Sequence, residues 1–420
     1  MERTILHCDC NSFFASVETV FCPELASVPM AVAGDGEMRH GIILAKNELA
    51  KGYGVLTAET IFSAKKKCPS LVLVPPHHEK YAEYSARVRR IYERYTDLVE
   101  PFGMDEAWLD VTASRSLFGD GFTIADEIRR TVKDELGITV SVGVSFNKVF
   151  AKMGSDYKKP DAVTVIDRSS YKEMLYHLPV ETLLFVGAQT ASALRASNIH
   201  TIGDLAEASP AFLRAKLGKA GETLSLYARG EDNSPVADIY GREDAKSVGN
   251  GMTFRRDLIT RDELKLGLYA LAEDVAHRLK KKKQKCTTVS ITVKDPSLRS
   301  FTRQRPIDPP TDLSREIAEA AYAIALDAVP QGKAVRMLTV TAMNLVHADD
   351  VVEQIGFFDT ELDRRRRRTG RLESAVENIR LRFGKGALTS GAVIGNDIGI
   401  QGATDTGDGK SDYTHDQNTV

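Results

Sequence analysis

Three carboxylates occupy positions in this sequence where charge is unexpected. Asp105 and Glu106 are adjacent inside the apolar stretch FGMDEAWLD, and Asp9 ends the apolar run that begins the chain. Burying these charges without a partner would cost several kcal/mol, so the acids need a cation. Mg²⁺ prefers oxygen ligands and completes its coordination shell with water and substrate phosphates. The three acids therefore predict a site for two magnesium ions, which would activate a 3′-hydroxyl and hold the leaving pyrophosphate.

The surrounding elements would have to bring these acids together. A lone Asp-Glu pair on a strand is more often an exposed edge feature or half of a salt bridge, and the third acid, Asp9, argues against that reading. The N-terminal run predicts a strand that ends near Asp9 and a helix from about Ser12. Residues 102–111 predict another strand, which we expect to pair in a hairpin with the alternating residues 139–146, on the far side of a helix.

Helical periodicity is clearest between residues 79 and 99. Apolar and aromatic residues recur there at spacings of three and four, at Tyr81, Tyr84, Val88, Ile91 and Tyr95. This spacing is typical of an amphipathic helix with one face packed on a core. Together with the alternating strands it predicts an α+β, palm-like sheet backed by two helices.

The composition and periodicity of the sequence change twice further along the chain. Residues 168–231 are short helical segments separated by Gly and Pro, and they predict a small all-α unit. Residues 232–245 are polar, with Gly and Pro, as in a linker. Residues 246–346 alternate strands and helices and predict a second α/β module. From Gly384 to the end of the chain the composition is rich in Gly, Thr, Asp and Asn, and we expect disorder.

The composition is that of a globular protein. The 420 residues are 42% hydrophobic and 27% charged. We find no run of 18 or more apolar residues and no basic-then-apolar layout of a secretory signal, so we expect a cytoplasmic protein with no membrane partner. Five cysteines, none in a C-x-x-C pair, predict reduced thiols rather than a disulfide framework.

Positive charge is concentrated in the second α/β module. Residues 246–346 contain 18 Lys and Arg against 11 Asp and Glu, a balance of +7, although the whole chain has a net charge of −2. The rest of the chain therefore carries −9. A basic module joined to an acidic body predicts a polyanionic partner.

Three motifs together resemble the Y-family translesion DNA polymerases, most closely the bacterial DNA polymerase IV group. They are HCDCNSFFASVE (7–18), FGMDEAWLDVT (102–112) and SVGVSFNKVFAKMGSDYKKPD (141–161), and the resemblance runs in order from about residue 4 to 346. It implies a right-hand polymerase with palm, fingers, a small helical thumb containing a helix-hairpin-helix, and a C-terminal α/β little finger. The implied ranges are palm 1–10 and 79–167, fingers 11–78, thumb 168–231, linker 232–245, little finger 246–346, and a clamp-binding motif with a basic tail 347–383.

The resemblance assigns the metal ligands. Asp9, Asp105 and Glu106 match the catalytic acids that hold two Mg²⁺ ions, with the backbone carbonyl of Cys10 as a further ligand. Asn11 stands where the family often has the second acid of a D-x-D motif. That acid is not a catalytic ligand in the family, so we expect the change to be tolerated.

The resemblance also assigns a nucleotide site. Phe13 and Phe14 match the aromatic pair beneath the incoming sugar, and Phe14 would be the steric gate that rejects a 2′-hydroxyl. An isolated Phe-Phe pair is more often core packing, but the neighbouring Asp9 favours the functional reading. Lys159 matches the basic residue that contacts the triphosphate, with Lys158 able to share the role.

The fingers depart from the family pattern. Glu48 and Lys51 stand where a phosphate-contacting Tyr and Arg are common. Lys51 keeps the charge of Arg without its bidentate fork, and we expect it to bind nucleotide. Glu48 would repel phosphate unless it turns away, and Lys46 could compensate. Ile42 and Leu44 are bulkier than the small residues frequent at the roof over the nascent base pair, so we expect poorer accommodation of bulky lesions.

Two further segments would hold primed template DNA. In the thumb, a helix-hairpin-helix resemblance places primer-backbone contacts near Gly187, although Phe185 replaces another hairpin glycine, and an ordinary helical pair is the alternative. In the little finger, the candidate DNA-facing residues are arginines that interleave with Ser and Thr: Arg255, Arg256, Arg299, Arg303 and Arg305. Such phosphate contacts predict binding that weakens with salt and ignores sequence.

A short motif follows the little finger. Gln354, Ile355, Phe357 and Phe358, in EQIGFFD, resemble the peptide by which bacterial polymerases dock on the sliding clamp. Exposed paired phenylalanines favour a partner that buries them, with a small tail helix as the alternative. We expect an otherwise monomeric protein.

Two other classes of function share part of this pattern. A palm-type nucleotidyltransferase such as a cyclase has the same acid geometry but needs neither a thumb nor a basic module. A catalytically weak DNA-binding or clamp-binding accessory protein could keep the fold, and Glu48 and Lys51 give that reading slight support. We expect instead a template-directed DNA polymerase that adds dNTPs to a primer 3′-hydroxyl in translesion synthesis. Its low fidelity is implied by the resemblance alone.

Overall fold

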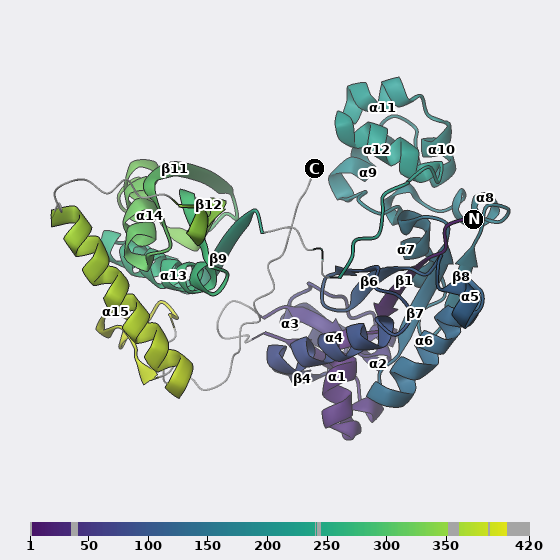
Figure 1. Ribbon diagram of the computed structural model, residues 1–420, viewed down its shortest axis with the longest axis horizontal. Helices are drawn as coiled ribbons and strands as arrows, with labels where there is room; N and C mark the ends of the chain where they lie inside the picture. The colour runs from purple at the N-terminus through teal and green to yellow at the C-terminus, as the bar shows by residue number, and fades with distance from the viewer. Residues whose placement is uncertain are drawn as a thin grey trace. The chain divides into compact units, whose positions relative to one another are not determined.

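The computed structural model describes residues 2–34, 41–239, 241, 245–351, 361–384 and 387–400. Two units can be distinguished along the chain (Figure 1), and we call them the N-terminal unit, mainly residues 2–239, and the C-terminal unit, mainly residues 245–400. Both combine sheets and helices, so the α+β class predicted from the sequence is confirmed. Among the described helices, none has both the length and the apolarity needed to cross a membrane.

A five-stranded sheet forms the centre of the N-terminal unit. Its strands, in spatial order, are β5 (Val99–Phe102), β6 (Glu106–Asp110), β1 (Ile5–Cys10), β7 (Val140–Ser145) and β8 (Val163–Ile166). The predicted hairpin between residues 102–111 and 139–146 is wrong, because β1 lies between these strands. A short turn pairs β6 with β5 instead, and helix α6 (Gly121–Leu136) carries the chain past β1 to β7.

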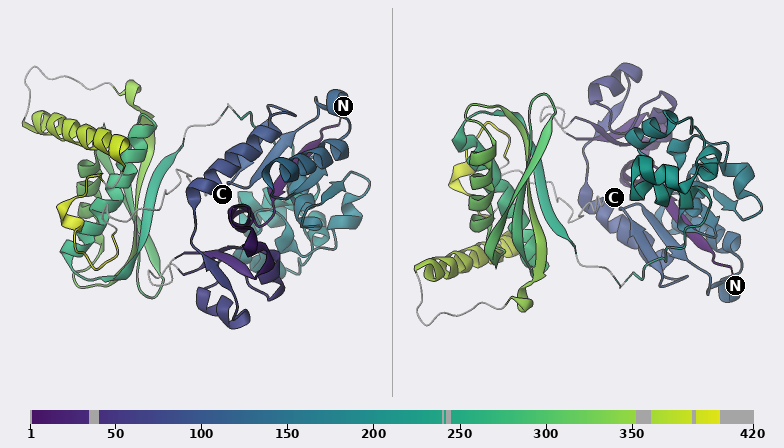
Figure 2. Two further views of the ribbon diagram at one scale, coloured as in Figure 1. Left: turned by 90° about the horizontal axis from the view of Figure 1, so that it is seen from below. Right: turned by 90° about the horizontal axis from the view of Figure 1, so that it is seen from above.

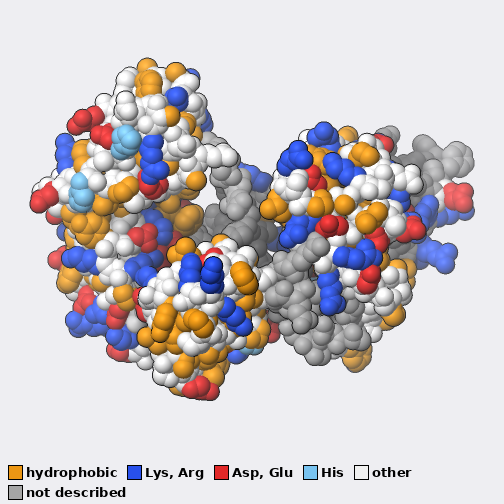
Figure 3. All heavy atoms as spheres, turned by 180° about the vertical axis from the view of Figure 1, so that it is seen from behind, with side chains coloured by type: hydrophobic (Ala, Val, Ile, Leu, Met, Phe, Trp, Pro, Cys, Tyr) orange, Lys and Arg blue, Asp and Glu red, His pale blue; other side chains and the backbone are white. Residues whose placement is uncertain are grey.

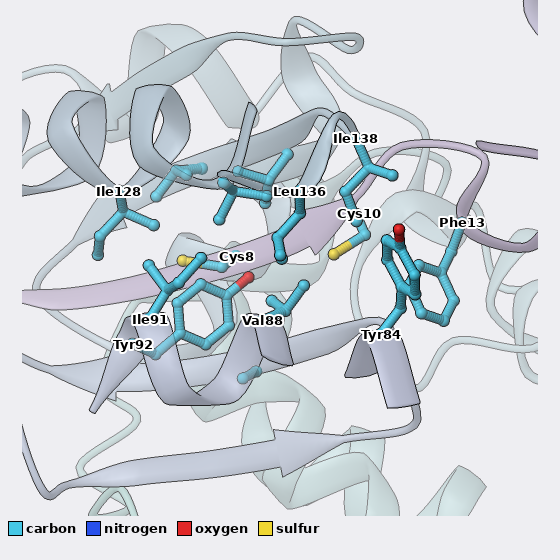
Figure 4. Close-up of a cluster of buried hydrophobic side chains, with 14 of the residues drawn as sticks. Cys8, Cys10, Phe13, Tyr84, Val88, Ile91, Tyr92, Ile128, Leu136 and Ile138 are labelled. Atoms are coloured by element: carbon cyan, nitrogen blue, oxygen red, sulfur yellow. The ribbon is translucent and has the colours of Figure 1, made fainter. Parts of the chain in front are cut away.

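The main core of this unit lies on one face of the sheet, beneath α4 (His78–Tyr92) and α6. Side chains alternate along a strand, so Leu6, Cys8 and Cys10 of β1 all enter this core. Figure 4 shows the two cysteines directed toward the side chains of α4. The two predicted helices behind the sheet are confirmed, and the predicted reduced state of the five cysteines agrees with their free thiols.

Helix α7 (Lys148–Tyr157) covers the opposite face, toward which His7 and Asp9 of β1 point. Its backbone comes unusually close to β7 at Gly143. A Cβ atom on Gly143 would lie 1.9 Å from the carbonyl oxygen of Ala151, a distance that real Cβ contacts do not show. The missing side chain therefore allows α7 to lie directly against the sheet.

Two smaller helical and mixed domains complete the N-terminal unit. The first contains α1 (Phe13–Phe21), a 3₁₀ turn (Pro23–Ser27), β2 (Met30–Ala33), β3 (Ile43–Lys46), α2 (Glu48–Gly52), α3 (Ile61–Lys67) and β4 (Val72–Val74). The second contains α8 (Tyr171–Leu175), a 3₁₀ turn (Val180–Thr182), α9 (Ala188–Arg195), α10 (Ile202–Glu207), α11 (Pro210–Leu217) and α12 (Lys219–Ala228). A short helix, α5 (Arg115–Phe118), precedes α6. The second domain shares its core with one side of α7, so the predicted all-α unit is anchored on the central sheet.

The C-terminal unit is a four-stranded antiparallel sheet with two helices on one face (Figure 2). Its strands, in spatial order, are β11 (Ser300–Thr311), β10 (Gln284–Lys294), β12 (Val335–His347) and β9 (Ser247–Leu258), and its helices are α13 (Arg261–Lys281) and α14 (Ser314–Ala328). Val289, Ile291 and Val293 alternate into the core under the helices. Ser290 and Thr292 alternate to the other face. The predicted second α/β module is therefore present.

A helix that follows the sheet packs back onto the C-terminal unit. After a short 3₁₀ turn (Ala348–Asp350), the next described element is α15 (Glu361–Phe383). The Glu373 carboxylate accepts hydrogen bonds from Lys280 Nζ at 2.5 Å and from Ser314 Oγ at 2.7 Å. These contacts tie the middle of α15 to α13 and α14.

The segment after α15 is also packed, which corrects the expectation of disorder from Gly384. A 3₁₀ turn (Gly391–Val393) leads to Ile398 and Ile400, which are 1% and 9% exposed and belong to the core of the C-terminal unit. Leu388, Val393 and Ile394 precede the two isoleucines, so this Gly-rich segment has enough apolar surface to bury. Residues 401–420 lie outside the described residues.

Candidate metal and nucleotide site

Two of the predicted ligands face each other across neighbouring strands. Asp9, near the end of β1, lies directly opposite Glu106, the first residue of β6. Asp105 lies in the turn before β6, and its carbonyl oxygen accepts a hydrogen bond from the Cys10 N–H at 2.9 Å. Strand pairing thus collects the three predicted acids and the Cys10 backbone at one end of the sheet.

Burial and mutual repulsion raise the pKa values of Asp9 and Asp105. Burial raises the pKa of Asp9, and the nearby charge of Glu106 raises it further. Burial, followed by the charges of Glu106 and Asp9, raises the pKa of Asp105 to about 6. Each effect disfavours negative charge at this end of the sheet, so a cation among the acids is stabilising.

Among the described residues, two lysines supply positive charge to these acids. Lys152 Nζ lies 3.1 Å from Asp9 Oδ2 and 2.7 Å from Glu106 Oε2. Lys159 Nζ lies 2.7 Å from the same Asp9 oxygen and 2.7 Å from Asp156 Oδ1. Burial alone would lower the pKa of Lys152, but the charges of Asp9 and Glu106 raise it above its ordinary value. Both amino groups are therefore charged and neutralise the acids.

Lys159 was predicted at the site from the sequence, whereas Lys152 was not. Lys152 reaches Asp9 because α7 lies directly against the sheet at Gly143. A weak signal existed in the sequence, since Lys148, Lys152 and Asp156 are spaced by four residues and share one face of a helix. Nothing in that spacing reveals which strand the helix covers.

His7 is a second residue that sequence reasoning missed. It is fully buried, and its Nδ1 lies 2.8 Å from Ser155 Oγ, with which it shares a hydrogen bond. Its Nε2 has no hydrogen-bond partner among the described residues and lies 3.3 Å from Glu106 Oε2. Burial lowers the pKa of His7 well below its ordinary value, so the ring is neutral. The signal was the period of two along β1, which places His7 on the same face as Asp9.

The donors at this end of the sheet fit a divalent cation. One ligand atom each from His7, Asp9 and Glu106 lie within 4.8 Å of one another. Asp105 is outside this group, although the charges of Asp9 and Glu106 raise its pKa. Carboxylate oxygens that repel one another when unpaired suit a hard cation, whereas an imidazole nitrogen is more typical of transition-metal sites, so Asp9 and Glu106 carry the fit to Mg²⁺ and His7 does not.

The aromatic pair after Asp9 lies at the start of α1. Phe13 is 3% exposed and packs in the main core. The half-buried ring of Phe14 stacks on Tyr81 of α4, with 4.1 Å between ring centroids and 11° between planes. Tyr81 in turn donates a hydrogen bond to Glu18 Oε1 at 2.5 Å. The Phe14 ring therefore has a fixed position at the start of α1.

Asn11 ties the turn after β1 to the loop that carries Lys159. Its Oδ1 accepts hydrogen bonds from the Asp161 N–H at 2.9 Å and from Thr139 Oγ1 at 3.0 Å. Its Nδ2 donates to Ser141 Oγ at 2.9 Å. The departure from the D-x-D pattern thus gives a buried side chain with satisfied hydrogen bonds.

The predicted finger residues form a separate ion pair. Lys51 Nζ lies 3.4 Å from Glu48 Oε2, and both side chains are about half exposed. Ser12 Oγ donates to Glu48 Oε1 at 3.5 Å. Lys46 Nζ donates to Thr57 Oγ1 at 3.0 Å, and burial, followed by the charge of Lys51, lowers the pKa of Lys46.

The roof and thumb positions are exposed to different degrees. Ile42 is 39% exposed, and Leu44 is half-buried against the main core. Gly187 is the residue before α9, and a Cβ atom built on it would meet no atom within 4 Å. Phe185 has a positive φ of 69° and is 61% exposed. The backbone near Gly187 is thus accessible to a ligand.

The predicted DNA-facing arginines differ in orientation. Arg303 and Arg305 of β11 lie opposite Ile291 and Val289, whose side chains point to the helix-covered face of the sheet. Directly opposed residues point the same way, so both arginines lie on the helix-bearing side of an edge strand. Both arginines therefore lie at the rim of the sheet. They do not lie on its open face, which carries Ser and Thr.

The other three arginines lie outside the middle of the sheet. Arg256 contacts Glu263 at 2.6 Å and Asp397 at 2.7 Å, and Arg299 Nε donates to Ser297 Oγ at 3.0 Å. The Arg255 N–H bonds to the Ile398 carbonyl at 2.9 Å. On the visible face in Figure 3, basic side chains are interspersed with acidic ones.

The predicted clamp-binding residues, Gln354, Ile355, Phe357 and Phe358, lie outside the described residues. The first residues described after them belong to α15, whose Arg365 and Arg366 pair with acids of α14. The structure therefore gives positions for part of the basic run that follows the motif and none for the motif itself.

Comparisons with known proteins agree with this architecture. The chain matches the impB/mucB/samB family over residues 8–156 and that family's C-terminal domain over residues 245–357. It is 48% identical over 394 residues to a protein of Acetivibrio thermocellus named DNA polymerase IV, covering 94% of this chain and 98% of that one. A DNA polymerase IV of Moorella thermoacetica is 39% identical over 385 residues, covering 91% and 94% of the two chains.

A solved structure has the same fold. It is the Y-family DNA polymerase chimera Dbh-Dpo4(243-245)-Dbh, which superposes with a TM-score of 0.72 at 22% identity. The match covers 82% of this chain and 99% of the chimera. At this level of identity the match is evidence for the fold alone.

Proposed function

Because this chain belongs to the DNA polymerase IV group of the Y-family DNA polymerases, and is thus a DNA-directed DNA polymerase, we propose that it carries out low-fidelity translesion synthesis. It would add dNTPs to a primer 3′-hydroxyl by two-metal phosphoryl transfer. The observation that carries the proposal is the convergence of Asp9, Asp105 and Glu106 at one end of the central sheet.

In this proposal the acids and the Cys10 backbone carbonyl hold two Mg²⁺ ions. When bound, the ions would supply activation of the 3′-hydroxyl and stabilisation of the leaving pyrophosphate. The chain's own lysines prepare the site, because Lys152 contacts both Asp9 and Glu106 and Lys159 contacts Asp9, which holds the two carboxylates together in the folded protein. Lys159 would then be available for the triphosphate.

The nucleotide would lie over the start of α1. The Phe14 ring, held by its stack on Tyr81, would meet a 2′-hydroxyl and so select deoxynucleotides, while Phe13 supports it from the core. Lys51 would supply charge from the fingers. The fixed stack matters because a freely rotating ring could move aside for a ribose.

Primed template DNA would contact the thumb and the C-terminal unit. The accessible backbone at Gly187 would bind phosphate, and Ser and Thr on the open sheet face would do the same. Arg255, Arg299, Arg303 and Arg305 would add charge from the rim of the sheet. We further propose that Gln354 to Phe358 bind a sliding clamp, and that the protein is otherwise a cytoplasmic monomer.

The test is extension of a primed DNA template with Mg²⁺ and dNTPs. The wild type should extend the primer, and Asp105→Ala with Glu106→Ala should abolish extension while DNA binding is retained. Glu83→Ala on α4, an exposed acid away from the site, is the matched control and should be active. Binding of primed DNA without extension by any of the proteins would favour the accessory-protein alternative and overturn the proposal.

A further inference from the structure

The start of α2, which carries Glu48, is held at a defined place by the residue before it, Asn47. Asn47 accepts hydrogen bonds from the Ala50 N–H at 2.9 Å and the Met30 N–H at 3.1 Å, and donates to the Val28 carbonyl at 2.8 Å. The first of these caps α2, and the other two attach its start to β2 and the segment before it. Glu48, the first residue of α2, therefore projects from an anchored point.

The Glu48 carboxylate lies where an anion would be favoured. It is 3.4 Å from Lys51 Nζ on one side and 3.5 Å from Ser12 Oγ on the other. Ser12 precedes the first residue of the nine-residue helix α1, and its hydroxyl makes no capping bond to that helix. The first turn of α1 contains no acid of its own, so the positive end of the helix favours a negative charge beside Ser12, where the Glu48 carboxylate lies.

We propose that Glu48 is an internal competitor of the nucleotide triphosphate, which neutralises Lys51 and occupies an anion position beside the start of α1 until a phosphate displaces it. This inference rests on the proposed polymerase function and concerns the same site. It makes Glu48 a residue that sets nucleotide affinity, without a role in the chemical step.

The ion pairs that Lys152 and Lys159 make with Asp9 and Glu106 differ from the Glu48–Lys51 pair in what a bound metal ion would do to them. Asp9 and Glu106 belong to the group that could hold a metal ion, so a bound cation would replace Lys152 and Lys159 as their partner. Glu48 is not part of the described metal group. The Glu48 carboxylate therefore repels an incoming triphosphate. This repulsion ends only if the carboxylate turns away.

The experiment removes the charge and keeps the shape. Glu48→Gln is compared with Glu83→Gln, another exposed glutamate, which lies 3.9 Å from Arg87 on α4. The first readout is the Kd of the next complementary dNTP on a primer–template ended with a dideoxynucleotide, which forms the complex without reaction. The second is the division between KM and kcat in single-nucleotide incorporation.

Glu48→Gln should lower both the Kd and the KM for dNTP by about threefold to fivefold, the range expected for a surface ion pair, with kcat unchanged. Glu83→Gln should change neither. In a Lys51→Gln background the effect of Glu48→Gln should shrink, because the lysine that it unmasks is missing.

Two results would overturn the inference while leaving the polymerase function intact. One is a Glu48→Gln enzyme that extends primers with unchanged or weaker dNTP affinity. The other is a loss of kcat with KM unchanged, which would give Glu48 a part in the chemical step. Failure of the wild type to bind dNTP or extend primers would reject this inference together with the proposed function.

Discussion

At the scale of single residues, the sequence predicted the acids of the site better than it predicted the groups that surround them. Asp9, Asp105 and Glu106 stood out because charge is rare beside buried strands, and their motifs are specific. His7 and Lys152 did not, because a histidine in an apolar strand and a lysine on an amphipathic helix are ordinary features. Only strand pairing and the close approach of α7 place them within 3.3 Å of a site carboxylate.

The raised pKa of Asp105 leads to a prediction for the metal-free protein. Folding moves this pKa from 3.8 to about 6, so the ionised carboxylate opposes folding above pH 6 and this penalty disappears as the pH falls below 4. In EDTA at pH 8, Asp105→Asn should therefore raise the free energy of unfolding by about 1–3 kcal/mol. Urea denaturation at several pH values measures this, and the gain should shrink toward pH 5.

The control for this prediction is Asp349→Asn, which changes an exposed acid of the other unit and should leave stability unchanged. An Asp105→Asn protein that is no more stable than the wild type at pH 8, or whose advantage grows as the pH falls, would contradict the assigned cause.

At the scale of elements, the sequence predicted the central sheet, its two covering helices and the second α/β module, because their periodicities are strong. It placed the strand at 139–146 beside the wrong neighbour, because pairing is decided by turn length and crossover and not by the strand's own pattern. It also missed the packing of residues 387–400, because the apolar residues of this Gly-rich segment follow no helix or strand periodicity.

Gly143 controls the position of α7, and Gly143→Ala tests this. The new Cβ would collide with the backbone at Ala151, so α7 must shift away from the sheet and carry Lys152 with it. The variant should lose at least about 1–3 kcal/mol of stability by overpacking. Gly52→Ala, where a Cβ meets no atom within 4 Å, is the matched control in chemical denaturation. Equal stability of the two variants would refute the close-contact argument.

The segment after α15 should contribute to the stability of the C-terminal unit. Ile398→Ala removes a side chain that is 1% exposed, and should lower the free energy of unfolding of this unit by about 2–4 kcal/mol. Ile394→Ala, four residues earlier and 73% exposed, should cost less than about 0.5 kcal/mol. Thermal unfolding of the full chain can compare them, and similar costs would show that the segment is not part of the core.

At the scale of the whole molecule, charge is unevenly divided, and DNA binding should reflect that division. The surplus of seven positive charges over residues 246–346 predicts affinity for DNA that is independent of sequence and falls with salt. Composition could indicate this partner, whereas the orientation of each arginine depends on the strand register and was beyond prediction.

A double Arg303→Ala, Arg305→Ala variant tests the contribution of the sheet rim. If both arginines contact phosphates, the slope of log affinity against log salt should become shallower by about 2. Fluorescence anisotropy of labelled primer–template between 50 and 200 mM salt, a range of about fourfold, measures the slope. Arg87→Ala with Arg130→Ala removes the same number of positive charges from the N-terminal unit and should leave the slope unchanged. An equal change of slope in both double variants would mean that the slope depends on net charge alone.

The two outer strands of the C-terminal sheet bear on how this protein meets other copies of itself. An exposed strand edge offers unpaired backbone groups to which a neighbouring chain can add its own strand. On β9 the Arg255 N–H is already bonded to the Ile398 carbonyl, and on β11 Pro306, Pro309 and Pro310 have no N–H to offer. The Arg255 contact and the three prolines thus hinder the addition of a strand at these positions.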